Sequence, residues 1–446
     1  MKSSNFGEEI IYYQENNPQN NSKILENLLS KNGFKNFNPE GITSYLTFRY
    51  PIGDLTMFEG YKKVPCGSEV KNGRIGTYWY PEFEEKKISF EKAKKKVEEL
   101  LIKSIKKLTK GKKFAVPFSG GIDSSLVVAI CRKIYPNKKI YTYSAGFYGD
   151  DEFEYSRLVA QKFNTIHKEK VLSKEDYIGE NSLLRSLIRQ KAEPLHPNEI
   201  ALAEIEKMAR EDGCEIALCG EGGDDIFGGY GQNLRMYLNY KEGIPFFGFF
   251  LNNYRYFSLE DRKKIIIEEY LVDDFELLNP FLDEKEIPED IRNKIFYFIQ
   301  KIHTPGLTIR GANAMRFNHL EPGFPYLDSE LVNFVNSLPF EYKLHWKSKE
   351  HEKKAKSMYF RDISEKMDIP KYILKKIAEK YLPDKIIYRK KYGFPVPFEK
   401  WFKNLKEWPL SKEIFKTNDI SRFNGWEKFM LINLNAFIEE FNRYKK

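Results

Sequence analysis

Two glycine-rich stretches carry the side chains best suited to chemistry. The first, SGGIDSS at residues 119–125, follows the apolar run at 114–118 and places the carboxylate of Asp123 among glycines and hydroxyls. Glycines let a backbone turn tightly and approach a ligand, and the free amides of a following helix favour bound phosphate. A carboxylate here would repel phosphate unless a divalent metal ion lies between them. The stretch therefore predicts a phosphate site that uses a metal ion.

The second stretch is GEGGDDIFGGY at residues 220–230, again after a β-rich run. It sets Glu221, Asp224 and Asp225 within five residues, and the sequence indicates no other charge partner for them. Such a cluster is costly unless its members bind a metal ion or accept a proton. The first stretch alone could be a glycine turn with a Ser or Asp helix cap, and it lacks the lysine of a G-x-x-x-x-G-K-S/T loop. With the second stretch, we expect both to face one site.

The elements around these stretches alternate between strands and helices. β-rich runs lie at 114–118, 140–144 and 216–218, and helical patterns lie at 90–108, 124–134, 153–163 and 199–210. This alternation predicts an α/β fold with a parallel sheet and helices on both of its faces. Ligands bind at the carboxyl ends of such strands, where the next helix offers its N-terminus. Both glycine-rich stretches are expected at such junctions.

Composition changes along the chain indicate three regions. Residues 1–40 are polar with one short helical piece, which predicts a loose N-terminal arm. Residues 41–85 have short runs broken by Pro and Gly, which predicts a short β linker. Residues 86–446 form the main domain, with an α/β core at about 110–231. Strand signals fade after that, so a mainly helical lobe is expected at about 232–446.

Bulk properties limit the class of protein. The net charge of +9 on 446 residues is spread along the chain; it suits a nucleotide, and we expect no nucleic-acid partner. The four cysteines, Cys66, Cys131, Cys214 and Cys219, have no C-x-x-C or disulfide spacing, which favours reduced thiols. No signal segment and no run near the ~18 apolar residues of a membrane span is found. We therefore expect a cytoplasmic protein without a membrane span.

Together, SGGIDSS and GEGGDD-x-FGGY resemble the asparagine synthetase family of ATP pyrophosphatases. That family's pattern is S-G-G-x-D-S-S, followed later by G-E-G-x-D-D/E-x-F-x-G-Y. FPYLDSELVNFVNSLP and YLPDKIIYRKKYGFPVPFEKW are similar to its later segments, and the likeness covers roughly residues 41 to 401. It implies a PP-loop (adenine nucleotide alpha hydrolase-like) synthetase domain over 86–446, after a short N-terminal extension with small β elements. It also implies an ATP-dependent carbon–nitrogen ligase: a substrate carboxylate attacks the α-phosphate, pyrophosphate leaves, and ammonia or an amine displaces AMP.

The resemblance also implies roles for individual residues. Pyrophosphate of ATP would be held by Ser119, Gly120, Gly121, Asp123, Ser124 and Ser125, with Mg²⁺ on Asp123 and Asp224. Ala145, Cys219 and Gly220 match positions that line adenine and ribose. Glu221 matches the acid that takes a proton from the attacking nitrogen. Lys391, favoured over its neighbour Lys390 on motif register, matches the lysine that stabilises charge on the α-phosphate and acyl carbon.

The start of the chain departs from the family. Full-length members begin with Met-Cys, and the processed cysteine is the nucleophile of a glutaminase domain. Here the chain begins Met-Lys-Ser-Ser, and some 40 residues precede the linker. We therefore expect no glutaminase domain, so that nitrogen comes as free ammonia, from a separate glutaminase subunit, or as an amine on the substrate. A homo-oligomer stays open.

Three further departures concern the acceptor. Gly323 in EPGFPYLD stands where the family has Arg, Ala192 replaces an acid, and the acid expected before the AM of GANAMRF is missing. If Gly323 faces the acceptor pocket, the pocket gains room and loses positive charge. A sugar acid or a peptide carboxyl group would then fit better than aspartate. The alternative is that the Arg held a neighbouring loop and that another basic residue, such as Arg316, replaces it.

Other functions remain open at this point. The chain could be an ammonia-dependent asparagine synthetase proper, a PP-loop enzyme that modifies RNA, or a degenerate homologue without catalysis. The acidic loop and the lack of clustered cysteines argue against RNA modification. The survival of Asp123, Glu221, Asp224 and Lys391 argues against a degenerate protein.

Overall fold

The central sheet is parallel and has the strand order β10-β9-β6-β7-β8. It comes from a computed structural model, which describes residues 1–71, 74–241, 243–282, 286–391, 393–394 and 396–446. The strands are β6 (Phe114–Pro117), β7 (Tyr141–Phe147), β8 (Ile166–Leu172), β9 (Ile216–Leu218) and β10 (Glu321–Gly323). Every residue of β6 and β9 is buried, as expected for strands covered on both faces. The predicted α/β fold with a parallel sheet is confirmed.

Helices cover both faces of this sheet. The helix α4 (Ile122–Ile134) packs on β6 and α5 (Phe153–Lys162) packs on β7 and β8, while α8 (Glu199–Glu211) crosses β6, β7 and β8. Right-handed crossovers place α4 and α5 on one face and α8, which leads back to β9, on the other. The long helix α3 (Phe90–Thr109), with an apolar stripe from Ala93 to Ile105, packs against α4.

The order of the strands creates a crevice between β6 and β9. From β6 the chain adds β7 and β8 on one side, whereas β9 and β10 lie on the other side of β6. Connections therefore leave β6 and β9 in opposite directions, which is the topological switch point where α/β sheets bind ligands. The two glycine-rich stretches follow these two strands.

The described residues of 232–446 are mainly helical, but three short strands interrupt them. β10 joins the central sheet beside β9, and β11 (Leu344–Trp346) pairs with β12 (Asp368–Pro370). The sequence of β10, EPG, has no strand pattern, and only its partner β9 reveals its role. The helices are α10 (Gly231–Leu234), α11 (Phe246–Tyr254), α12 (Leu259–Ile265), α13 (Ile291–Phe298), α14 (Thr304–Phe317), α15 (Ser329–Asn336), α16 (Phe340–Lys343), α17 (Lys349–Ala355), α18 (Tyr372–Ala378), α19 (Asp384–Ile387), α20 (Phe398–Trp401) and α21 (Gly425–Phe441).

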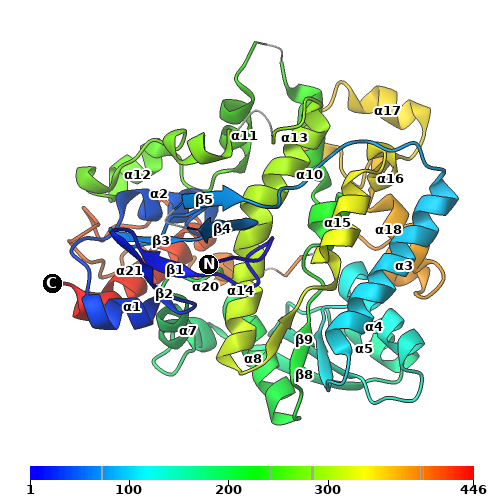
Figure 1. Cartoon of the computed structure of the whole chain (residues 1–446), viewed down its shortest axis with the longest axis horizontal. Helices are drawn as coiled ribbons and strands as arrows, with labels where there is room; N and C mark the ends of the chain where they lie inside the picture. The colour runs from blue at the N-terminus through cyan, green and yellow to red at the C-terminus, as the bar shows by residue number, and fades with distance from the viewer. Residues whose placement is uncertain (72–73, 242, 283–285, 392, 395) are drawn as a thin grey trace.

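The N-terminal segment is packed against the rest of the chain, so the expectation of a loose arm is wrong. The strands β1 (Tyr12–Gln14), β2 (Asn17–Ser22) and β3 (Tyr61–Lys63) form an antiparallel sheet, followed by the pair β4 (Ser68–Lys71) and β5 (Arg74–Thr77). The expected short helix is α1 (Leu25–Asn32). Figure 1 shows the N-terminal elements beside the C-terminal α21. The Tyr45 hydroxyl donates a hydrogen bond to the Met430 carbonyl at 3.1 Å.

A helix replaces the first of the strands expected in the linker. The helix α2 (Pro39–Phe48) begins with Asn38, whose side chain accepts a hydrogen bond from the Glu40 amide, and with a proline in its first turn. Both features favour a helix start, and burial of residues 41–48 stabilises it. The division into arm, linker and synthetase domain stays a prediction. Among the residues that the structure describes, no helix is both long and apolar enough to cross a membrane.

Candidate active site

The loop after β6 turns sharply into α4. Gly120 has φ +73°, and a Cβ there would lie 2.6 Å from Cβ of Tyr155, so only glycine fits without displacement. The amides at the start of α4 point out of the helix end, and Ser119 and Ser124 line the cavity beside them. Ser125 lies behind the loop, fully buried, and its hydroxyl has no hydrogen-bond partner.

The loop after β9 touches the first loop because glycines allow it. A Cβ on Gly223 would lie 2.6 Å from Oδ1 of Asp123, and a Cβ on Gly220 would lie 3.0 Å from the Ser124 amide nitrogen. The loop turns through Gly222 at φ +90° and enters the short helix α9 (Gly223–Phe227). The structure therefore brings the two predicted loops into contact at the switch point.

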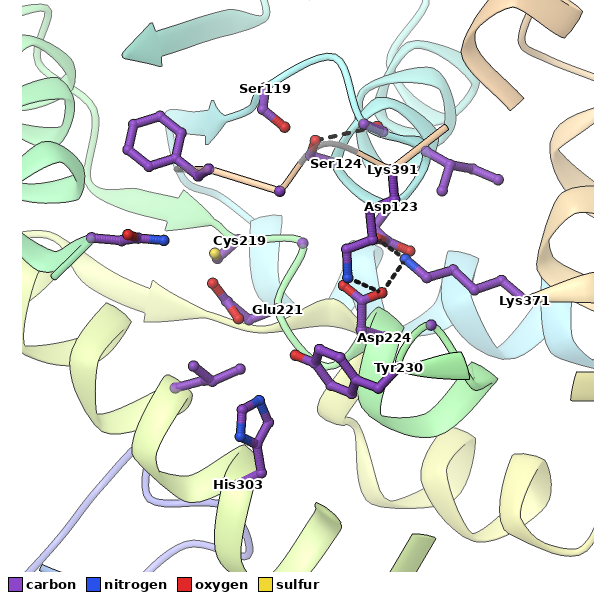
Figure 2. A pocket seen from close by; sticks show the side chains of 18 of the residues that line it. Ser119, Asp123, Ser124, Cys219, Glu221, Asp224, Tyr230, His303, Lys371 and Lys391 are labelled. Carbon is purple, nitrogen blue, oxygen red and sulfur yellow. Dashed lines mark hydrogen bonds and ion pairs between the residues drawn. The ribbon is translucent and has the colours of Figure 1, made fainter. Parts of the chain in front are cut away.

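A buried lysine bridges the aspartates of the two loops. Lys371 Nζ forms an ion pair with Asp123 and lies 2.7 Å from Oδ1 of Asp224, which is also 2.9 Å from Nζ of Lys391 (Figure 2). Burial alone would raise the pKa of Asp224, but the two lysines lower it below its usual range. Burial and the nearby charge of Asp224 raise the pKa of Asp123 despite Lys371. The expectation that these carboxylates lack a charge partner is wrong.

The two aspartates fit a magnesium ion only together with other oxygen ligands. Oδ1 of Asp123 is buried and has no hydrogen-bond partner. Among the described residues, no group of three or more His, Cys, Asp and Glu side chains could hold a metal ion. Mg²⁺ is typically bound through one or two carboxylates plus substrate phosphates. The donor set is therefore that of a metal ion bound together with a nucleotide.

The two loops open into a cavity of about 790 Å³, within the usual range for small-molecule sites. The sequence-predicted residues that line it are Ser119, Gly121, Asp123, Ser124, Ala145, Cys219, Gly220, Glu221, Asp224 and Lys391. Gly120 and Ser125 do not line it, and neither does the exposed Lys390. Lys391 Nζ lies 4.8 Å from the ring centroid of Tyr230, another lining residue.

Farther along the cavity lies a second polar group, around Glu221. Arg310 of α14 pairs with Glu221 through Nη2, and its Nη1 donates to Nδ1 of His196 at 3.1 Å. Burial and the charges of Arg49 and Arg310 hold the pKa of His196 well below its usual range, so His196 is neutral. Figure 2 shows Glu221 on the side of the pocket toward His303, away from Lys371.

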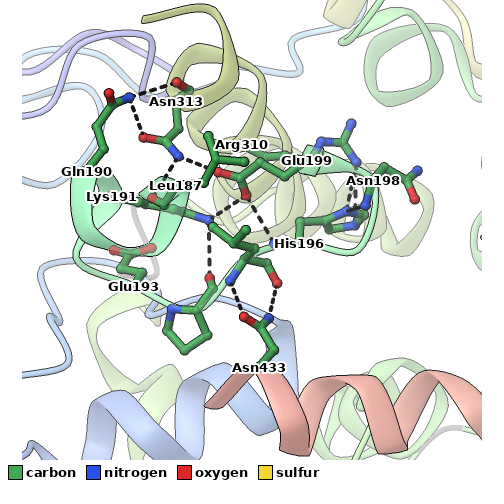
Figure 3. A network of polar contacts seen from close by, with 12 residues as sticks. Leu187, Gln190, Lys191, Glu193, His196, Asn198, Glu199, Arg310, Asn313 and Asn433 are labelled. Carbon is green, nitrogen blue, oxygen red and sulfur yellow. Dashed lines mark hydrogen bonds and ion pairs between the residues drawn. The ribbon is translucent and has the colours of Figure 1, made fainter. Parts of the chain in front are cut away.

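A buried network supports this second group from behind (Figure 3). Glu199 pairs with Lys191 at 3.2 Å and accepts a hydrogen bond from the side-chain amide of Asn313 at 2.6 Å. Asn433 of α21 donates to the Leu195 carbonyl at 2.6 Å, just before His196. The network fixes the loop that presents His196 to the cavity.

None of the three departures from the family pattern lines the cavity. Gly323 lies opposite Leu218 in the sheet, and a Cβ there would lie 2.8 Å from Cδ2 of that leucine. Of the two alternatives for Gly323, the one in which it faces the acceptor pocket is wrong, because Gly323 lies against β9 and does not line the cavity. Ala192 ends α7 (Leu184–Lys191), and Asn313, which precedes the AM of GANAMRF, belongs to the buried network.

Several cations that line the cavity were not singled out from the sequence, among them Arg49, Arg310 and Lys371. The suggested Arg316 instead contacts the Glu8 carbonyl and does not line the cavity. Lys371 has a left-handed backbone, φ +56°, which is uncommon for a residue other than glycine. Nothing in the sequence distinguishes these three among 73 lysines and arginines, because tertiary packing brings them to the loops.

Comparisons with known proteins agree with this geometry. The family model described as asparagine synthase matches residues 96–428. Asparagine synthetase [glutamine-hydrolyzing] 1 of Bacillus subtilis is 26% identical, with 90% of this chain and 66% of that protein aligned. Putative asparagine synthetase [glutamine-hydrolyzing] 1 of Methanocaldococcus jannaschii is also 26% identical, over 69% of this chain and 50% of that protein. The chain thus spans between half and two thirds of the length of these relatives.

Among solved structures, the U34-tRNA thiolase NcsA of Methanococcus maripaludis aligns with 54% of this chain and 90% of its own. The sequence identity is 13% and the TM-score is 0.24, which is too low to support an argument about function.

Proposed function

Because this chain belongs to the asparagine synthase family, we propose that it is an ATP-dependent carbon–nitrogen ligase that forms an acyl-adenylate and then an amide. One observation carries the proposal. The loops after β6 and β9 meet at the switch point, with Asp123 and Asp224 on one side of the cavity and Glu221 farther along it. A nucleotide and an acceptor can therefore share one cavity.

In the proposed first step, the acceptor carboxylate attacks the α-phosphate and pyrophosphate leaves. Ser119, Ser124 and the amides at the start of α4 bind the leaving pyrophosphate. Asp123 and Asp224 would hold Mg²⁺, which supplies positive charge to the phosphates. Ala145, Cys219 and Gly220 line the space for adenine and ribose. Lys391, half-exposed at the cavity, stabilises the charge that grows on the α-phosphate.

In the second step, nitrogen displaces AMP. Glu221 takes the proton from the attacking nitrogen, and Arg310 positions it by holding one carboxylate oxygen. The nitrogen donor is ammonia, supplied free or by a separate glutaminase subunit, or an amine on the substrate. Since Gly323 lies outside the cavity, aspartate is as good a candidate acceptor as a sugar acid or a peptide carboxyl group.

The two steps can be separated in one experiment. Pyrophosphate and AMP release from ATP is screened against a panel of carboxylates with ammonium and Mg²⁺. With the best acceptor, Glu221→Gln should keep carboxylate-dependent exchange of pyrophosphate into ATP and lose amide formation by about 100-fold or more. Asp224→Asn should lose both reactions. Glu330→Gln, at an exposed ion pair with Lys103, is the matched control. Amide formation by Glu221→Gln at the wild-type rate would remove its role as base.

A further inference from the structure

The N-terminal segment supplies part of the cavity wall next to Glu221. Arg49, one residue after α2 ends, lines the cavity together with His196 and His303. A small adjoining pocket of about 10 Å³ is lined by the same three side chains and Leu307. Arg49 lies outside residues 96–428, so the family match assigns nothing to it.

Arg49 is a cation that no acid balances within the part of the chain that the structure describes. Among the described residues no carboxylate forms an ion pair with its guanidinium, and its buried Nε has no hydrogen-bond partner. The guanidinium instead lies 4.2 Å from the ring centroid of Tyr256. Neighbouring arginines of the cavity are paired: Arg310 with Glu221, and Arg255 with Asp274 at 3.2 Å.

The nearest carboxylate of the cavity, Glu221, is already paired with Arg310, and the two histidines beside Arg49 add no negative charge. Burial and the charges of Arg49 and Arg310 lower the pKa of His303 to about 3 and that of His196 well below its usual range. Both rings are therefore neutral at physiological pH. The hydroxyl of Tyr254, another lining residue, is hydrogen-bonded to Nδ1 of His303. At this end of the cavity, Arg49 therefore adds a positive charge beside neutral histidine and tyrosine side chains.

The backbone holds Arg49 in place at a cost. Its φ is +70°, in the left-handed region, and its amide donates to the Tyr45 carbonyl at 2.7 Å to close α2. A non-glycine residue in this region is uncommon, and such strain concentrates at functional sites. Stacking on Tyr256 fixes the other end of the side chain. The guanidinium is thus pre-positioned before any ligand enters.

We propose that Arg49 binds a second anionic group of the acceptor, so that the enzyme selects carboxylates that carry another negative charge. The inference rests on the proposed ligase function. A guanidinium binds carboxylate and phosphate through a planar fork of N–H donors. The phosphates of ATP belong at the other side of the cavity, with the amides of α4 and Lys371. The anion next to Arg49 is therefore part of the acceptor, as a carboxylate or a phosphate.

The test compares acceptors that differ by one anionic group. The pairs are aspartate with β-alanine and succinate with propanoate. In a third comparison, the acceptor is a carboxylic acid whose second anionic group is a phosphate. Binding is measured by calorimetry in the presence of Mg²⁺ and a non-hydrolysable ATP analogue, and AMP formation is measured with ATP. The wild-type protein should favour at least one dianion by about 10- to 100-fold.

The variants isolate the charge of Arg49. Arg49→Asn removes it, and asparagine tolerates the left-handed backbone, so the variant should fold with an unchanged Tm. It should lose the preference for dianions and keep the affinity for the ATP analogue, while Arg49→Lys should keep part of the preference. Arg422→Asn is the matched control, because Arg422 is exposed and also lies over a ring, that of Phe423 at 5.9 Å.

The outcomes separate this inference from the ligase itself. A wild-type protein that favours no dianion, or an Arg49→Asn variant that keeps the preference, would overturn the role of Arg49 even if AMP forms. Arg49-dependent binding of a dianion without AMP formation from any carboxylate would support the subsite and contradict the ligase function.

Discussion

Asp225 should make the stability of this protein depend on pH in an unusual direction. The residue follows Asp224 in the acidic loop, is 1% exposed, and accepts a hydrogen bond from the Thr304 hydroxyl at 2.6 Å, while its Oδ2 has no partner. Burial and the charges of Asp224 and Glu221 raise its pKa from 3.8 to about 7, although the Thr304 bond lowers it. The folded state therefore holds a proton that the unfolded state has released.

A raised carboxyl pKa contributes stability that is complete below pH 3.8 and is lost as the pH rises through about 7. At 1.36 kcal/mol per pKa unit, the free energy of unfolding falls by about 4 kcal/mol in total as the pH rises, and about 2 to 3 kcal/mol of this loss occurs above pH 5. Asp225→Asn keeps the shape of the side chain and cannot ionise. Its stability relative to wild type should therefore improve by about 2 to 3 kcal/mol between pH 5 and pH 8.5.

The assay is urea unfolding of both proteins at a series of pH values, with identical ionic strength. Asp273→Asn is a suitable control, because it makes the same change at an exposed position. A difference between Asp225→Asn and wild type that stays constant from pH 5 to pH 8.5 would refute the assignment of a buried, protonated Asp225.

Three further outcomes are expected. Lys371→Met removes the shared counter-ion of two partly buried carboxylates, of which Asp224 keeps Lys391, so the free energy of unfolding should fall by about 3 kcal/mol. Mg²⁺ should raise the Tm of the variant more than that of wild type; equal responses to Mg²⁺ would count against a shared metal site. Gly323→Ala pushes a Cβ into Leu218, so it should lower the free energy of unfolding by about 1 to 3 kcal/mol without changing the KM of the acceptor. The control Gly76→Ala, whose Cβ meets open space, should lower it little. A changed acceptor KM would place Gly323 at the pocket. Purified chain should not release glutamate from glutamine, because burial raises the pKa of all four cysteine thiols and none is an activated nucleophile; glutamate formation would disprove this.

The two strands and the two ligand loops of the site could be predicted from the sequence, because neighbouring residues determine them. An apolar run followed by glycines and acids indicates a buried strand that ends in a ligand loop, and β6 and β9 both behave this way. Their contact also follows, since parallel strands end at one edge of a sheet. The helices of the α/β core were visible for the same reason, through their 3.6-residue period.

What remained hidden depends on contacts between distant parts of the chain. Lys371 reaches Asp123 across 248 residues, and no periodic pattern marks such a lysine. β10 exists because β9 offers a free edge, not because EPG favours a strand. The position of Gly323 depends on this pairing, so the sequence left open whether it faces the pocket. The N-terminal segment looked loose because its polar composition conceals the few apolar residues, such as Phe6 and Leu25, that are fully buried.

The central claim is that this cavity cleaves ATP between its α- and β-phosphates on behalf of a carboxylate. The most direct measurement is quantitative analysis of the nucleotide products after incubation with ATP, Mg²⁺, ammonium and the carboxylate panel. AMP and pyrophosphate should form in equal amounts, only when a carboxylate is present, and both should be lost in Asp123→Asn. Formation of ADP and phosphate, or AMP release that no carboxylate stimulates, would contradict it.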